Sequence, residues 1–250
     1  MDRIILIETS TALCSTALSE DGRLVCYRES ETPRAHASLT AVFIDEMLRE
    51  KALSLKDCAA VCVSEGPGSY TGLRVGVSSA KGLCFGAGIP LLSVGTLEVL
   101  VAQALSEGQL NCPQSEGEAA SDTKTAAAAC AEPFKYIVPM IDARRMEVYT
   151  ALFSANGERL SETEAKVIDS ESYKDILKEG PVLFIGDGAG KCEGTLNHPN
   201  ARFLQTCPKA SAMCALAQRE LDEKRFKDVA YLEPFYLKDF VTTVSKKKLF

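Results

Sequence analysis

Short apolar runs alternate along the first hundred residues with segments in which apolar side chains recur every three or four positions. Apolar runs of about four to eight residues bounded by turn residues are typical of buried strands. From residue 39 to residue 48 the apolar positions follow helical spacing, which predicts an amphipathic helix. The predicted order is βββαβαβα, with strands at 3–9, 15–18, 24–27, 59–64 and 89–94 and helices at 36–53, 69–87 and 97–105, the last capped by Thr96.

The same order of elements recurs from residue 134 onward. Asn156-Gly157 is a typical hairpin dipeptide, and Ser170 is a suitable helix cap. The predicted strands are 136–141, 146–153, 159–168, 182–185 and 201–205, and the predicted helices are 170–178, 190–196 and 210–224. The two halves share little visible sequence, so what is duplicated is the order of strands and helices. We expect an α/β fold with an N-terminal subdomain at 1–105 and a C-terminal subdomain at 134–225.

Two duplicated βββαβαβα subdomains that face a cleft describe the actin-like fold shared by actin, sugar kinases and Hsp70 chaperones. In that fold the first hairpin turn of each half approaches a nucleotide phosphate. The matching turns here are residues 8–11 (ETST) and 142–145 (DARR). The second turn has Arg144 and Arg145 where nucleotide-binding proteins of this fold tend to keep a glycine, so these arginines could reach a partner or an anion. Residues 186–190 (GDGAG) are either a turn that cradles adenosine or a tight connection.

Two segments lie outside the repeated pattern. Residues 106–133 are rich in Gly, Ser, Glu, Asp and Ala with almost no bulky apolar side chain, as is typical of a low-complexity insertion or linker. Their alanine run also allows a helix that forms on a partner. Residues 226–250 are interpreted as a C-terminal tail, whose basic run 246–248 we expect to be solvated.

Charge and composition narrow the class of function. The net charge of −6 argues against independent binding to a nucleic-acid backbone, because Lys and Arg must neutralise its phosphates. The chain shows neither an apolar run of membrane length nor a secretory leader pattern, so we expect a cytoplasmic protein with no membrane partner. Its 10 cysteines include no CxxC pair, and Cys58 and Cys62 are interpreted as core thiols. With His36 and His198 as its 2 histidines, no zinc site has ligands at workable spacing.

The run GPGSYTGLRVG, from Gly66 to Gly76, leads from a predicted strand into a predicted helix. An amide-rich helix start of this kind can hold an anion. The run is not a P-loop, because no Lys-Ser or Lys-Thr follows its second glycine, and it is not a GxGxxG motif either. Gly72 and Gly76 lie four apart, which lets another backbone approach the helix closely. Two interpretations stay open: packing within the chain, or a helix face for a protein partner.

Five stretches together resemble the TsaB family, also called YeaZ: ILIETSTALCSTAL, GPGSYTGLRVGVSSAKGL, PLLSVGTLE, IDARRMEVYTALF and LEPFYL. The resemblance covers nearly the whole chain apart from the alanine-rich segment. It implies an actin-like protein that dimerises with TsaD, its catalytic paralogue, to place threonylcarbamoyl on the adenosine beside the tRNA anticodon. It further implies a non-catalytic scaffold, an accompanying TsaE-type ATPase, tRNA contact only through the complex, and a homodimer as an alternative when the chain is alone.

The histidine pair that binds metal in the catalytic paralogue has no counterpart here. The paralogue's pattern V-N-H-L-E-x-H corresponds to residues 94–100, where Thr96 and Leu100 replace the two histidines. A threonine hydroxyl is a poor ligand and leucine is none, so we expect no metal there. His36 is followed four positions later by Thr40 and is interpreted as a hydrogen-bonded structural residue.

We therefore predict a protein with no catalytic residue, no metal and no tightly bound cofactor, with weak nucleotide binding at a subunit interface left open. The alternatives are an ATP-dependent kinase or ATPase of the same fold and a metallopeptidase-like protein. The predicted partner interface consists of His36, Ser69, Tyr70, Thr71, Gly72, Arg74, Val75, Gly76 and Ser79.

Overall fold

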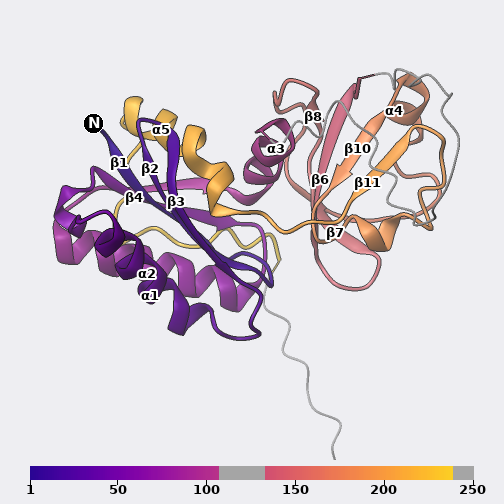
Figure 1. Cartoon of the computed structure of the whole chain (residues 1–250). Coiled ribbons are helices and arrows are strands. Elements are labelled where there is room, and N and C mark those ends of the chain that lie inside the picture. Colours follow the sequence, from indigo (N-terminus) through magenta and orange to yellow (C-terminus); the bar gives the residue numbers. More distant parts are fainter. Residues whose placement is uncertain (107–132, 239–250) are drawn as a thin grey trace, which may run out of the picture.

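The first lobe is built on a five-stranded sheet of order β3-β2-β1-β4-β5, seen in a computed structural model that describes residues 1–106 and 133–238 (Figure 1). The first three strands are antiparallel, and β4 and β5 continue from β1 in parallel. A tight hairpin turn at Asp21 and Gly22 joins β2 to β3. The strands are β1 (Arg3–Glu8), β2 (Cys14–Glu20), β3 (Arg23–Ser30), β4 (Ala60–Gly66) and β5 (Leu91–Gly95).

Helices cover both faces of this sheet because its central strands are apolar on both sides. Ile5 and Ile7 of β1 pack toward α1 (His36–Glu50) and α2 (Tyr70–Ala87), with the short η1 (Leu55–Asp57) between those helices in the chain. Ile4 and Leu6 point to the opposite face, since neighbouring strand residues alternate in direction. Figure 1 shows α1 and α2 together below the sheet and α5 (Cys214–Asp222) above it.

The second lobe repeats the arrangement with the order β11-β10-β6-β7-β9, while the short β8 pairs with β6. In both sheets the first strand of the lobe is central, its antiparallel neighbours lie on one side and its parallel neighbours on the other. The predicted duplication and the actin-like α/β fold are therefore confirmed. The elements are β6 (Tyr136–Asp142), β7 (Glu147–Thr150), β8 (Phe153–Ser154), β9 (Glu164–Val167), α4 (Lys174–Glu179), β10 (Val182–Ile185), η3 (Gly190–Cys192) and β11 (Ala201–Leu204).

Several predicted boundaries in this lobe are wrong. The strand expected at 146–153 is divided into β7 and β8, and the strand expected at 159–168 is reduced to β9. The helix expected from Ser170 begins only at Lys174, because the Asp169 carboxylate accepts the amide N–H groups of Glu171 and Ser172 and holds them in a turn. The helix expected at 210–224 consists of η4 (Ala210–Met213) followed by α5.

The lobes exchange their last helices. Leu97, Leu100 and Val101 of α3 (Thr96–Ser106) belong to the core of the second lobe. In return, Met213 of η4 and Ala217 of α5 pack against Ile4 and Leu6, on the face of the first sheet opposite α1 and α2. The packing units therefore do not coincide with the expected ranges 1–105 and 134–225, because an amphipathic stripe does not reveal which sheet a helix covers.

Most of the chain's unusual segments fall outside the described residues. The predicted insertion at 106–133 lies almost wholly there, as does the basic run 246–248. In the part of the chain that the structure describes, no helix has the length and apolar character needed to cross a bilayer.

Candidate functional site

The glycine-rich run forms a turn between β4 and α2 that is pressed against residues 8–11. The Ser10 carbonyl accepts the Ser69 amide N–H at 2.6 Å, and the Ser69 hydroxyl caps α2 by accepting the Gly72 amide at 3.3 Å. The predicted helix start at Ser69 or Tyr70 is thus confirmed. The run serves to bring α2 onto the turn that follows β1.

Gly72 and Gly76 belong to the interior, so their assignment to a partner interface is wrong. A Cβ on Gly72 would lie 2.0 Å from the Thr9 carbonyl oxygen, and a Cβ on Gly76 would lie 2.3 Å from the Thr9 hydroxyl. The same hydroxyl donates a hydrogen bond of 2.8 Å to the Gly72 carbonyl. A spacing of four predicts that two glycines share a helix face, but it does not say whether that face points inward.

The outward face of α2 forms an open groove with the start of α1. The groove has a volume of about 410 Å³, and we call it the outward groove. Tyr70 is 38% exposed, and its ring lies 5.4 Å from the Arg74 guanidinium. The lining residues are Ala37, Tyr70, Thr71, Arg74, Val75, Ser78 and Ser79, which include five members of the predicted interface.

The two remaining predicted interface residues have structural contacts. His36 starts α1, and its Nε2 lies 3.0 Å from the Thr11 carbonyl oxygen. This contact confirms the interpretation of His36 as a hydrogen-bonded structural residue. Ser69 is the exposed cap of α2, at the end of the outward groove.

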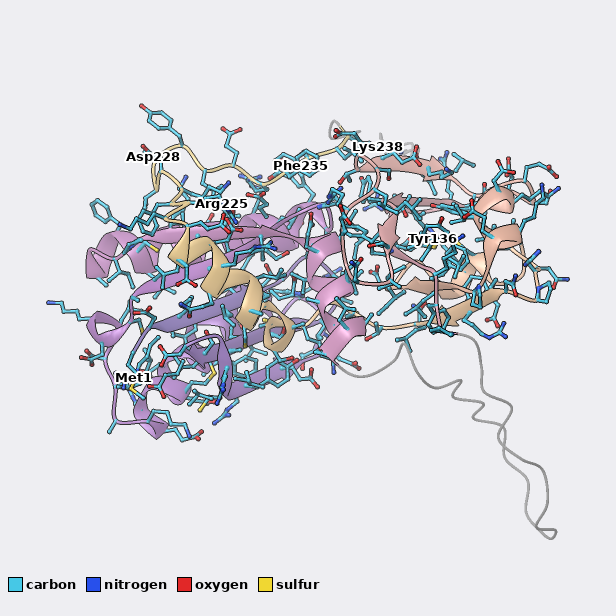
Figure 2. All side chains as sticks on the ribbon, turned by 90° about the horizontal axis from the view of Figure 1, so that it is seen from above. Met1, Tyr136, Arg225, Asp228, Phe235 and Lys238 are labelled. Carbon is cyan, nitrogen blue, oxygen red and sulfur yellow. The ribbon has the colours of Figure 1, made fainter. Side chains whose placement is uncertain are left out.

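Residues 226–238, the described part of the expected C-terminal tail, form a strap that packs on the first lobe. It runs beside α2 and reaches the second lobe at Lys238 (Figure 2). The Lys81 ammonium donates to the carbonyls of Ala230 and Leu232, and the Phe235 amide donates to the Glu65 carbonyl at 2.7 Å. The apolar and aromatic residues of LEPFYL are the feature of the sequence that indicates a packed segment after α5.

The strap lengthens the outward groove. The Tyr236 and Tyr70 ring centroids are 4.9 Å apart. A second hollow of about 340 Å³ adjoins the first and shares Tyr70, Arg74 and Ser78 with it. Leu232, Glu233 and Pro234 of the strap form its other wall, which sequence reasoning missed.

The residues aligned with the paralogue's metal ligands are used for packing. Thr96 is the first residue of α3 rather than its cap, and its hydroxyl lies 2.7 Å from the Ser64 hydroxyl. Leu100 is fully buried in the core of the second lobe. Over residues 1–106 and 133–238, no three His, Cys, Asp or Glu side chains are grouped so as to hold a metal ion.

The turn after β1 is buried, and it begins with a carboxyl group whose pKa is raised. Glu8 is fully buried, and burial raises its pKa to about 7 despite a 2.6 Å hydrogen bond from the Ser10 amide. The Glu8 Oε2 atom and the Ser10 and Thr11 hydroxyls have no hydrogen-bond partner among the described residues. Across the lobes, burial raises the pKa of Asp187 to about 6. Both carboxyls would repel a phosphate once they are ionised, and the turn after β1 contains no basic side chain to offset this repulsion.

The other two candidate nucleotide turns differ from each other. A Cβ on Gly186 would lie 2.1 Å from the Met140 carbonyl oxygen, which favours the interpretation of residues 186–190 as a tight connection. In contrast, Arg144 and Arg145 of the second hairpin turn are exposed.

Two sheets with the same strand arrangement define a two-lobed actin-like α/β protein, and an open groove lies on one helix pair of its first lobe. The protein YeaZ from Pseudomonas aeruginosa has this fold: a TM-score of 0.75 at 23% identity covers 95% of this chain and all of that one. The family model of TsaD, tRNA N6-adenosine threonylcarbamoyltransferase, matches residues 30–117.

Curated relatives extend the likeness over the full length. The tRNA threonylcarbamoyladenosine biosynthesis protein TsaB of Escherichia coli (strain K12) is 30% identical, over 99% of this chain and 98% of that protein. TsaB of Haemophilus influenzae is 28% identical, over 96% of this chain and 94% of that protein. The chain belongs to the TsaB family of tRNA threonylcarbamoyladenosine biosynthesis proteins, which confirms the resemblance seen in the motifs.

Proposed function

We propose that this chain is a non-catalytic scaffold that docks through the outward groove onto a TsaD-type catalytic paralogue during formation of threonylcarbamoyladenosine in tRNA. The proposal rests on the observation that both helices that form the groove lie within the residues matching the TsaD family model. Residues 30–117, which match the TsaD family model, contain both α1 and α2. Two chains that share this helix pair can pack it face to face in a pseudo-twofold arrangement.

The use of the other candidate sites supports a role without chemistry. The turn after β1 lies buried under α2, and Thr96 and Leu100 are committed to packing. We infer that no cofactor is held tightly by this chain alone. In the same proposal the protein is cytoplasmic, a TsaE-type ATPase joins the complex, and tRNA is contacted through the assembled complex because the chain carries a net charge of −6.

A Ser78→Trp substitution tests the docking surface. Ser78 is exposed, lines both hollows and makes no side-chain hydrogen bond within the described residues, so the fold should tolerate the change. The indole would fill the groove and keep the partner helices apart. We expect affinity for the purified paralogue, measured by calorimetry, to fall by about a hundredfold or more, as for the loss of a central interface contact.

A matched control is Ser170→Trp, an exposed serine that precedes α4 on the second lobe. It should bind the paralogue as the wild type does, and both variants should keep the wild-type melting temperature. Unchanged affinity for a folded Ser78→Trp protein would place the interface elsewhere and defeat the proposal.

A further inference from the structure

The hairpin turn between β6 and β7 holds two consecutive arginines in the left-handed backbone region. The φ angles are 69° at Arg144 and 51° at Arg145. Residues other than glycine adopt this region at a cost in free energy, and such strain is concentrated where a turn serves a function. The turn therefore holds both exposed side chains at its tip by means of an unfavourable backbone.

The acidic groups nearest in the chain do not neutralise these arginines. Asp142 accepts the Lys191 ammonium, together with the backbone amide of Arg144 at 2.8 Å. Glu147 forms an ion pair with Lys238 of the strap. Neither Arg144 nor Arg145 has a side-chain hydrogen bond or ion pair with another described residue, so the turn presents two uncompensated positive charges.

The strap places this turn beside the outward groove. The Tyr236 ring lies against the Tyr70 ring at the groove, and only two residues later Lys238 reaches Glu147. Two residues of extended chain span at most about 7 Å. Glu147 itself follows Arg145 by two positions, so the arginine turn lies a short distance from the groove. Figure 2 labels Phe235 and Lys238 of the strap, which connects the two.

We propose that Arg144 and Arg145 extend the docking surface onto the second lobe, where their guanidinium groups pair with carboxylates of the docked paralogue. This inference rests on the proposed function. A guanidinium presents a planar fork of donors that matches a carboxylate, and charges at the rim of an interface chiefly accelerate association. Continuity with the groove and the chain's overall negative charge favour a protein carboxylate over an RNA phosphate as the recognised group.

The double variant Arg144→Gly/Arg145→Gly tests this assignment. Glycine adopts the left-handed region readily, so the backbone of the turn is kept while both charges are removed. We expect an unchanged or higher melting temperature. Association with the purified paralogue at low salt should be about tenfold slower, and the difference should shrink at high salt, where rim charges are screened.

Arg23→Ala is the matched control, because Arg23 is an exposed arginine at the far end of the first sheet from the turn after β1. It should associate at the wild-type rate. A wild-type rate and salt dependence for the double variant would overturn the inference. Normal pairing with the paralogue combined with weaker tRNA retention by the assembled complex would also overturn it, because the arginines would then contact RNA.

Ser78→Trp keeps the two proposals distinguishable. If Ser78→Trp abolishes pairing and the arginine variant does not slow it, the docking function stands and this inference falls. If Ser78→Trp pairs normally, the proposed function falls, whatever the arginine variant does.

Discussion

The two ends of α2 both contain glycines, but only those at its first end are closely packed. On the inward face, Gly72 and Gly76 lie against Thr9, where a Cβ would collide with the backbone or hydroxyl oxygen. At the outer end of the helix, Gly82 and Gly86 have no atom within 4 Å of the position of a Cβ. Gly72 and Gly76 allow the helix to pack closely on the turn. At Gly82 and Gly86 a side chain would meet no neighbouring atom. Glycine in a motif thus marks a constraint only where a neighbour is close.

The largest effect that tests this comparison is expected from Gly72→Ala. The added Cβ would lie 2.0 Å from a backbone oxygen, which cannot move aside without shifting the turn after β1. We expect a loss of about 4 kcal/mol in the free energy of unfolding, above the usual overpacking cost of about 1–3 kcal/mol. Urea titration measures the loss, and wild-type stability would show that Gly72 is not closely packed.

The second-largest effect is the pH dependence of stability that Glu8 causes. Glu8 lies at the end of β1, next to the turn that contacts Gly72 and Gly76 of α2. Its pKa is raised from 4.5 to about 7, so between these values the folded chain binds more protons than the unfolded chain. The resulting stability is complete below pH 4.5 and is lost as the pH rises through 7, a change of about 3 kcal/mol at 1.4 kcal/mol per pKa unit.

Glu8→Gln checks this pH dependence, because the amide mimics the neutral carboxyl at every pH. The variant should be more stable than the wild type at pH 8, and its unfolding free energy should fall less steeply over the same pH range. Some slope should persist through Asp187, whose pKa is raised in the same direction, to about 6. Equal slopes for both proteins would mean that Glu8 is ionised in the fold.

The smallest effect is expected from Gly82→Ala, the same chemical change on the same helix. A Cβ there meets nothing within 4 Å, so the gain in helix propensity is not offset by a clash. We expect the free energy of unfolding to rise by about 1 kcal/mol. If thermal unfolding showed Gly82→Ala and Gly72→Ala to be equally destabilising, the distinction between the two ends of α2 would be lost.

The sequence by itself determined the local elements and the family. Continuous apolar runs located the strands of the first lobe, and helical periodicity located the three longest helices, because burial of a face imposes its pattern on the chain. The start of α2 at residue 69 or 70 followed from the glycine-rich turn that precedes it. Five long motif matches were enough to indicate the TsaB family.

Only the tertiary structure decided which surfaces face each other. Periodicity shows that a helix has an apolar face, but the partner of that face depends on contacts between residues far apart in the chain. This is why the exchange of α3 and α5 between lobes and the packed strap at 226–238 escaped sequence reasoning. For the same reason the sequence left open whether Gly72 and Gly76 face the interior or a partner. Within the predicted interface, Tyr70 and Arg74 differ from the two glycines only by the side of α2 on which the fold placed them.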